Sequence, residues 1–242
     1  CLSLYAADND LITKQITIQL EKAGTLPDRI GSSRKYKITN LKIIGEINGT
    51  DLRMIREMAG RDYIGNSTDG KLSVLDLSEA KIVEGGDCYY NDYHHYDYYT
   101  SNDVIGWYAF MDCYRLTSLT LPAGITSIGD EAFQGCSGLT SIYVYAEKVP
   151  KIDSNAFKGF DAKKCTVYVP MGTRDDYRLS EFGDYFENIV EFESTGIDKT
   201  TTSTDVEEVA RYSVNGQRLS APTKGLNIVK YSDGSVKKVA VR

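Results

Sequence analysis

Short blocks of apolar residues recur along the middle of the chain, with turns between them. Leu116–Leu121 and Leu72–Leu77 both follow the pattern L-x-x-L-x-L, and Ile38–Ile43 is a weaker copy. The last three positions of each block alternate between apolar and polar residues, as in a strand that buries one face. Each block is therefore predicted to be one strand of a parallel sheet.

The stretches around these blocks are also repeated. Ile105–Pro122 aligns with Ile128–Val144 at a shift of 23 residues, and a third copy at a shift of 24 runs from Ile152 to Pro170. Self-similarity at a fixed period indicates a stacked solenoid in which every copy adds one coil. We expect an α/β-type solenoid whose parallel sheet has about five rungs.

Each regular copy contains Ala-Phe followed three residues later by Cys. The phenylalanines are expected to fill the interior, and Cys113 and Cys136 are expected to stack on adjacent coils as small apolar groups. Phe160 takes the cysteine position in the third copy. A disulfide between Cys113 and Cys136 is an open alternative at this point.

These repeats resemble the BspA-like leucine-rich repeats of Bacteroidetes surface proteins. The matching positions are Ala109-Phe110, Cys113, Leu116, Leu119, Leu121-Pro122, Ile128-Gly129, Ala132-Phe133, Cys136, Leu139 and Ile142. The resemblance covers residues 38–192, and residues 8–37 are expected to cap the open end of the solenoid. It implies a role in adhesion or in contact with host or matrix proteins.

The composition changes after Phe192. Residues 193–206 are polar and are predicted to be a linker. Beyond it, Asn215-Gly216 is a strong signal for a hairpin turn, and further strand patterns follow. Residues 207–242 are therefore predicted to be a small antiparallel β module. They resemble the C-terminal β modules of exported Bacteroidetes proteins.

The first seven residues, 1–7, fit two kinds of export signal. They can be the tail of a signal peptide cut near Ala6 or Ala7, or the start of a lipoprotein with its lipid on Cys1. An arbitrary chain boundary is the third alternative. A net charge of −6 argues against nucleic acid as a partner, and no apolar run approaches the roughly 20 residues of a membrane span. The expected location is the cell surface, the outer membrane or the extracellular space.

One insertion, residues 83–104, interrupts the repeat and has an unusual composition. It holds six of the 18 tyrosines and both histidines, namely Tyr89, Tyr90, Tyr93, His94, His95, Tyr96, Tyr98 and Tyr99. Tyrosine offers a large contact area and a hydrogen-bonding tip, as in binding loops. The insertion is either a contact loop for a protein or glycan partner, or an excursion that covers one coil with its own aromatic side chains.

The outward face of the sheet is a second candidate surface. The alternation places Lys42, Asp76, Thr120, Tyr143 and Tyr168 along one row, and Asn40, Val74, Ser118, Ser141 and Thr166 along the next. Tyr143 and Tyr168 are the expected binding hot spots, because aromatic residues dominate interface energies. Plain solvated surface is the alternative.

Catalytic and metal-binding motifs are not evident. The sequence lacks GxSxG, HExxH, a Walker loop and GxGxxG, and an enzyme would have to use Cys88 beside His94 or His95. Adjacent histidines usually diverge, so neither a metal site nor a cofactor is expected. We expect a non-enzymatic surface protein that binds another protein. A glycan-binding module and a structural envelope component are the alternatives.

Overall fold

The computed structural model describes residues 11–192, 208–213, 218–219, 221, 224–231 and 236–241. The chain divides into two compact units, residues 1–195 and 196–242. Each unit is described by itself. Cys1 with the rest of the predicted export signal, the predicted linker 193–206 and the Asn215-Gly216 turn lie outside the described residues.

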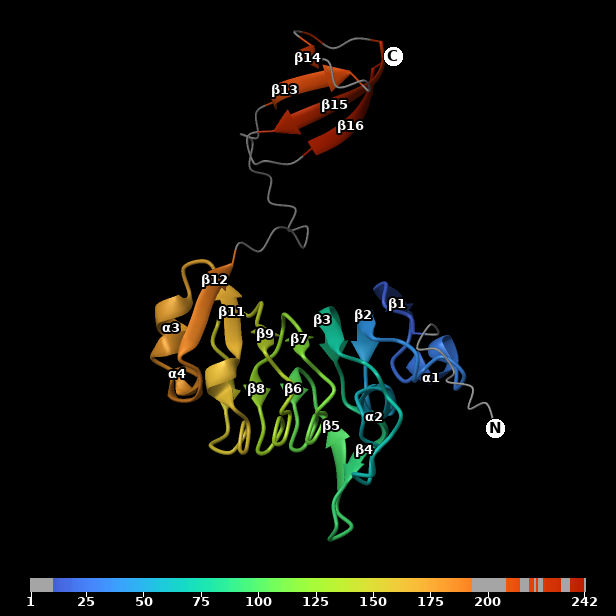
Figure 1. Ribbon diagram of the computed structural model, residues 1–242, viewed down its shortest axis with the longest axis vertical. Helices are drawn as coiled ribbons and strands as arrows, with labels where there is room; N and C mark the ends of the chain where they lie inside the picture. Colours follow the sequence, from blue (N-terminus) through green and yellow to red (C-terminus); the bar gives the residue numbers. More distant parts are fainter. Residues whose placement is uncertain are drawn as a thin grey trace, which may run out of the picture. The chain divides into compact units, whose positions relative to one another are not determined.

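Unit 1 is a solenoid whose main sheet has seven parallel strands (Figure 1). In spatial order they are β1 (Ile16–Leu20), β2 (Asn40–Ile47), β3 (Val74–Ile82), β7 (Ser118–Thr120), β9 (Ser141–Tyr143), β11 (Thr166–Pro170) and β12 (Asn188–Phe192). The five predicted strands are β2, β3, β7, β9 and β11. The predicted number of about five is too low, because β1 and β12 add one strand at each end.

The repeat does not predict the two end strands. Ahead of β1, Ile12 pairs with Ile38, but three residues separate it from Ile16 where two separate Ile38 from Leu41. In β12, Glu191 pairs in register with Val169 of β11, where the repeat has an apolar residue. β1 lies within the segment predicted to be a cap. Both strands are the edge strands of the same sheet.

The inward positions of the sheet form one continuous apolar row. Leu41, Leu75, Leu119, Ile142 and Val167 lie side by side in register and are fully buried. Removing this apolar surface from water is the main force that stacks the coils.

A ladder of hydroxyl groups runs along the sheet just before the strands begin. The hydroxyl of Ser73 donates to the main-chain oxygen of Thr39 at 3.1 Å. Thr117 donates to Ser73 at 3.0 Å, and Thr140 donates to Thr117 at 3.1 Å. Every step joins one coil to the coil before it. The small hydroxyl side chains at this position therefore fix the register of neighbouring coils as well as their spacing.

A second, three-stranded parallel sheet contains β6 (Val104–Ile105), β8 (Ser127–Ile128) and β10 (Lys151–Ile152). The predicted phenylalanine interior is present beside it. The rings of Phe110 and Phe133 are stacked at 5.5 Å with an interplanar angle of 1°, and those of Phe133 and Phe157 are stacked at 5.1 Å and 8°.

The two stacked cysteines of the repeat, Cys113 and Cys136, are fully buried free thiols, so the disulfide alternative is not realised. The thiol of Cys136 donates to the main-chain oxygen of Phe110 at 3.0 Å. Burial raises the pKa of Cys113 to about 11 and holds the pKa of Cys136 well above its ordinary value. Both side chains act as small apolar groups.

Helices are short and few among the described residues. They are α1 (Leu26–Ile30), α2 (Gly49–Met58), α3 (Arg174–Arg178), α4 (Glu181–Tyr185) and the 3-10 helix η1 (Ala162–Lys164). No helix in this part of the chain is long and apolar enough to cross a membrane.

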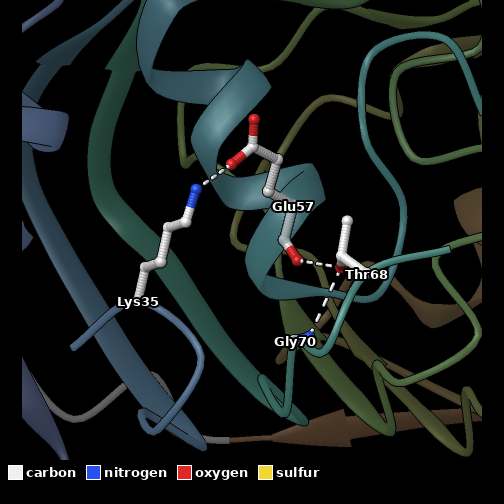
Figure 2. Close-up of polar contacts among 4 residues, drawn as sticks. All are labelled: Lys35, Glu57, Thr68 and Gly70. Atoms are coloured by element: carbon white, nitrogen blue, oxygen red, sulfur yellow. Dashed lines mark hydrogen bonds and ion pairs between the residues drawn. The ribbon is translucent and has the colours of Figure 1, made fainter. Parts of the chain in front are cut away.

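Figure 2 shows how the chain after α2 satisfies the end of that helix. The hydroxyl of Thr68 donates to the main-chain oxygen of Glu57 at 2.5 Å and accepts from the amide of Gly70 at 3.3 Å. The Glu57 carboxylate pairs with the ammonium group of Lys35 at 2.5 Å. A Cβ atom at position 70 would lie 2.2 Å from the main-chain oxygen of Met58, so the close approach requires glycine.

Unit 2 is a four-stranded antiparallel sheet, in agreement with the predicted β module. Its spatial order is β14 (Arg218–Leu219), β13 (Glu208–Ser213), β15 (Gly225–Tyr231) and β16 (Val236–Val241). Val229 is buried in this sheet, and so is Arg211.

Candidate binding surfaces

The tyrosine-rich insertion folds as an antiparallel hairpin. Its strands are β4 (Gly85–Asn91) and β5 (Asp97–Thr100), with Tyr90 opposite Tyr98. The hairpin packs against α2 and projects from the coils of unit 1 (Figure 1). The sequence placed the insertion but did not predict its hairpin fold.

The inner side of the hairpin, here called its base, is anchored by Tyr89 and Tyr90 of β4, which are both buried. The hydroxyl of Tyr89 donates to the main-chain oxygen of Trp107 at 2.8 Å. The ring of Tyr90 lies 5.2 Å from the ring of Tyr108, and the guanidinium group of Arg56 lies over it at 4.8 Å. Burial raises the pKa of both phenols. These two predicted site residues hold the hairpin and do not face solvent.

The turn of the hairpin and the outer side of β5, together called the tip, present Tyr93, Tyr96 and Tyr99 to solvent. Tyr98 on the same strand is half-buried, and its ring lies 4.9 Å from that of Tyr108. Tyr93 is 85% exposed, Tyr96 is 67% exposed and Tyr99 is 54% exposed, and His94 and His95 are exposed beside them. The insertion covers one coil with its own aromatic side chains, as one alternative predicts, and the contact loop stays a prediction. Its base covers a coil, and its tip is available for contact.

Asp92 fixes the shape of the tip. Its carboxylate accepts from the amides of His94 at 2.9 Å and Tyr96 at 3.0 Å, and from the hydroxyl of Tyr98 at 3.2 Å. Desolvation works against ionisation here, but the hydrogen bonds outweigh it and lower the pKa of Asp92. The turn thus has a charged acceptor at its centre.

Trp107 lies next to the hairpin and was missed by sequence reasoning. Its side chain is 52% exposed, and its ring is 6.5 Å from that of Tyr98. A Cβ atom at position 129 would lie 2.5 Å from Cδ1 of Trp107, so the indole rests closely on Gly129 of the next coil. One sequence signal for Trp107 was available. The next copy of the repeat has the polar residue Asp130 at the aligned position, which indicates that this position faces solvent.

The outward face of the main sheet has the predicted register. Both predicted rows are present as runs of directly paired residues, from Lys42 to Tyr168 and from Asn40 to Thr166. The first row is charged at one end, where the ammonium group of Lys42 pairs with Glu79 at 2.7 Å and with Asp76 at 3.3 Å.

The other end of the first row is aromatic. The rings of Tyr143 and Tyr168 are half-buried and stacked at 4.4 Å with an interplanar angle of 9°. The ring of Phe192 approaches Tyr143 edge-on at 6.0 Å and Tyr145 at 4.9 Å. Burial raises the pKa of Tyr143. These four rings form one continuous aromatic area on the sheet.

The environment of Cys88 does not favour a nucleophile. The thiol is partly buried, and burial together with the neighbouring Asp97 raises its pKa. A nucleophilic cysteine needs the opposite shift. Among the described residues, no three or more His, Cys, Asp and Glu side chains gather as a metal site would require.

Residues 103–220 match the family described as a BspA type leucine rich repeat region, in six copies. The match covers slightly less than half of the chain. Strands β7, β9, β11 and β12 lie within it, whereas β1, β2 and β3 continue the same sheet ahead of it. Together with the seven-stranded parallel sheet, this match supports the predicted fold class, a leucine-rich-repeat solenoid with a separate β module. A comparison with curated proteins gives no match.

Proposed function

We propose that this chain is a non-enzymatic surface protein that binds another protein through the tip of its tyrosine-rich hairpin. The observation that carries the proposal is the exposure of Tyr93, Tyr96 and Tyr99 on a hairpin with a buried base. Exposed aromatic patches of this kind mark interaction sites more often than inert surface. Tyrosine contributes a large contact area and loses little side-chain entropy on binding.

The anchored base supports the proposal further. The hydroxyl of Tyr89 donates to the main-chain oxygen of Trp107 in the next coil, and the carboxylate of Asp92 accepts from two amides of the turn. The tip therefore has its shape before a partner binds. A preformed binding surface avoids the entropy cost of ordering a loop on association. A flexible loop of the same composition would bind more weakly.

We propose the aromatic area of the sheet as a second contact surface. Tyr143 and Tyr168 are stacked and half-exposed, and Val190 of the edge strand β12 pairs in register with Tyr168 and is exposed. Solenoid proteins present broad, rigid faces that suit partner binding. The charged end of the same row lacks such apolar contact area.

The proposal includes export of the protein. It is supported by the resemblance of the repeats to those of surface proteins. Adhesion to a host or matrix protein is the role that fits an exported scaffold of this kind.

The test uses the full chain and a triple variant, Tyr93→Ala/Tyr96→Ala/Tyr99→Ala. Binding to a panel of purified extracellular matrix proteins is measured by surface plasmon resonance, beside a glycan array. We expect the triple variant to bind its protein partner at least roughly tenfold more weakly, because aromatic side chains dominate binding energies.

The matched control is Met171→Ala/Leu179→Ala, which removes two exposed apolar side chains elsewhere in unit 1. This variant should bind as the wild type does. Equal binding by the triple variant would contradict the assignment of the tip. Binding to glycans alone would replace the protein partner with the glycan alternative.

A further inference from the structure

We infer that the hairpin surface recognises an arginine-bearing segment of a partner protein, with Trp107 and the exposed tyrosines as the rings over which guanidinium groups lie. The inference rests on the proposed function and names the chemistry of the partner. Three features support it: the acidic residues of the hairpin, its exposed aromatic rings, and the arginines of α2 that lie over tyrosine rings nearby.

The residues of the hairpin itself carry charges of one sign, whereas Arg53 and Arg56 of α2 lie against its inner side. No lysine or arginine occurs between Lys81 and Arg115, whereas six acidic residues do. They are Glu84, Asp87, Asp92, Asp97, Asp103 and Asp112. Hydrogen bonds lower the pKa of Asp92 and Asp97, so both are ionised at neutral pH. An anionic surface attracts a cationic partner and repels an anionic one.

The exposed aromatic rings lie on the same part of the molecule as the acidic residues of the hairpin. Trp107 and the tip tyrosines Tyr93, Tyr96 and Tyr99 are the large exposed aromatic side chains of this part of the molecule. In the described part of the chain, no lysine or arginine lies over any of these four rings. The ring of His94 lies 4.1 Å from the ring of Tyr93, and Gly129 lies against one side of Trp107, so a cation from outside would lie over the remaining faces of the four rings.

The inner side of the hairpin already uses this interaction. The guanidinium group of Arg56 lies over the ring of Tyr90 at 4.8 Å. On the same helix, the guanidinium group of Arg53 lies over the ring of Tyr63 at 3.4 Å. The inner rings thus receive arginines from the chain itself. The outer rings have the same chemistry and receive none.

Arginine fits this surface better than lysine or a sugar does. Its planar guanidinium group stacks on aromatic faces and bonds to carboxylates at the same time, whereas an ammonium group is a compact, strongly hydrated charge. A neutral glycan could stack on the rings and donate hydroxyl hydrogen bonds to the carboxylates, but it would lack the charge attraction that a guanidinium group adds. An acidic glycan would be repelled by them.

The test measures binding of short labelled peptides to the full chain by fluorescence anisotropy. The peptides are twelve residues long and alternate serine with arginine, lysine or glutamate. We expect the arginine peptide to bind more tightly than the lysine peptide, and the glutamate peptide not to bind. Raising the salt concentration from 50 to 300 mM should weaken binding of the arginine peptide, because salt screens exposed charges.

Two variants separate the rings from the charges. Trp107→Ala should weaken binding of the arginine peptide about two- to fivefold, the worth of a cation–π contact at an exposed site, and Trp107→Phe should weaken it less. Glu84→Gln/Asp97→Asn should weaken binding and make it less dependent on salt. Equal melting temperatures show that the variants are folded.

Three outcomes overturn the inference. These are equal binding of the three peptides, binding unaffected by salt, and displacement of the arginine peptide by a neutral oligosaccharide. If a matrix protein needs the three tip tyrosines but the arginine peptide neither binds nor competes with it, the proposed function stands and this inference falls. If the peptide depends on Trp107 while the tip variant keeps its protein partner, the inference stands and the assignment of the tip falls.

Discussion

The guanidinium group of Arg56 donates a hydrogen bond from Nη1 to the main-chain oxygen of Tyr108, at 2.8 Å and across 52 residues of sequence. The same group donates to Ala109 at 3.0 Å and to Met111 at 3.3 Å. Arg56 is fully buried, and no carboxylate in the described part of the chain forms an ion pair with it. Main-chain carbonyl groups accept hydrogen bonds from both Nη atoms of this buried charge, whereas its buried Nε has no partner in the described part of the chain. The bonds from the Nη atoms tie α2 to the first regular coil.

Replacing Arg56 by methionine should destabilise unit 1 by about 3 kcal/mol, because it leaves several buried carbonyl oxygens without a donor. Urea denaturation followed by circular dichroism measures the loss. The matched control is Arg53→Met on the same helix, where a partly exposed arginine lies over Tyr63. The control should cost less than about 1 kcal/mol, since an exposed cation–π contact contributes no more than that. Equal losses in both variants would contradict the role of Arg56.

Phe133 occupies the middle of the stack of three phenylalanine rings, with Phe110 on one side and Phe157 on the other. Phe133→Ala should cost about 3–5 kcal/mol, because it opens a cavity between two coils that cannot close without breaking strand pairing. Phe160→Ala, at the half-buried end of the stack, should cost clearly less. Thermal unfolding of the two variants side by side decides this point.

Gly70→Ala should destabilise unit 1 by roughly 3 kcal/mol or more, because its Cβ would lie 2.2 Å from the main-chain oxygen of Met58 and 2.3 Å from that of Glu57. Gly124→Ala is the control, since the nearest atom there is a side-chain oxygen of Asp103 at 3.7 Å. This change should stay within about 0.5 kcal/mol of the wild type. The same denaturation curves would refute the prediction if the two substitutions had equal effects.

The buried thiols predict a loss of stability in alkaline solution. Burial raises the pKa of Cys113 to about 11 and that of Cys165 to about 12, from an ordinary value of 9.0. The neutral thiols contribute fully below the ordinary value, where both folded and unfolded chains keep the proton. Above it, only the unfolded chain ionises, so stability falls by up to about 1.4 kcal/mol per pH unit for each thiol.

Urea denaturation at several pH values between 7 and 10 measures this slope. Cys113→Ala should be less stable at pH 7, because it leaves a cavity, yet its stability should fall less steeply above pH 9. A slope that is unchanged in the variant would contradict the assignment to the thiol. Buried tyrosines such as Tyr89 and Tyr177 also have raised pKa values and add to the fall in stability as pH approaches 10, so the effect of the thiol is the difference in slope between the wild type and the variant.

The repeat made much of unit 1 predictable. Side chains along a strand point alternately to its two faces, and the copies are 23 or 24 residues apart. The face to which each strand residue points therefore follows from its position in the repeat. The pairing of Thr120 with Tyr143, and of Tyr143 with Tyr168, could be written down from the sequence. The stack of phenylalanines followed from the same argument.

Features that lie outside the repeat could not be predicted in this way. The partners of Arg56 are main-chain oxygens, which carry no sequence signal, and Trp107 sits at a variable position of its coil. The sequence shows where the insertion lies but does not predict its secondary structure, because its tyrosines follow neither a clear strand period nor a clear helix period. Which tyrosines anchor the hairpin and which face solvent depends on contacts with α2 and with the next coil.

The hydroxyl ladder links the coils of Ser73, Thr117 and Thr140, so the length of unit 1 could change there by whole coils. Duplicating residues 117–139 would insert one further strand while every coil kept its link to the coil before it. The hairpin and the pair of Tyr143 and Tyr168 would then move apart by one strand spacing, about 4.8 Å. The affinity of a partner that contacts both surfaces would then depend on the number of coils between them. Selection could act on that number without changing any contact residue.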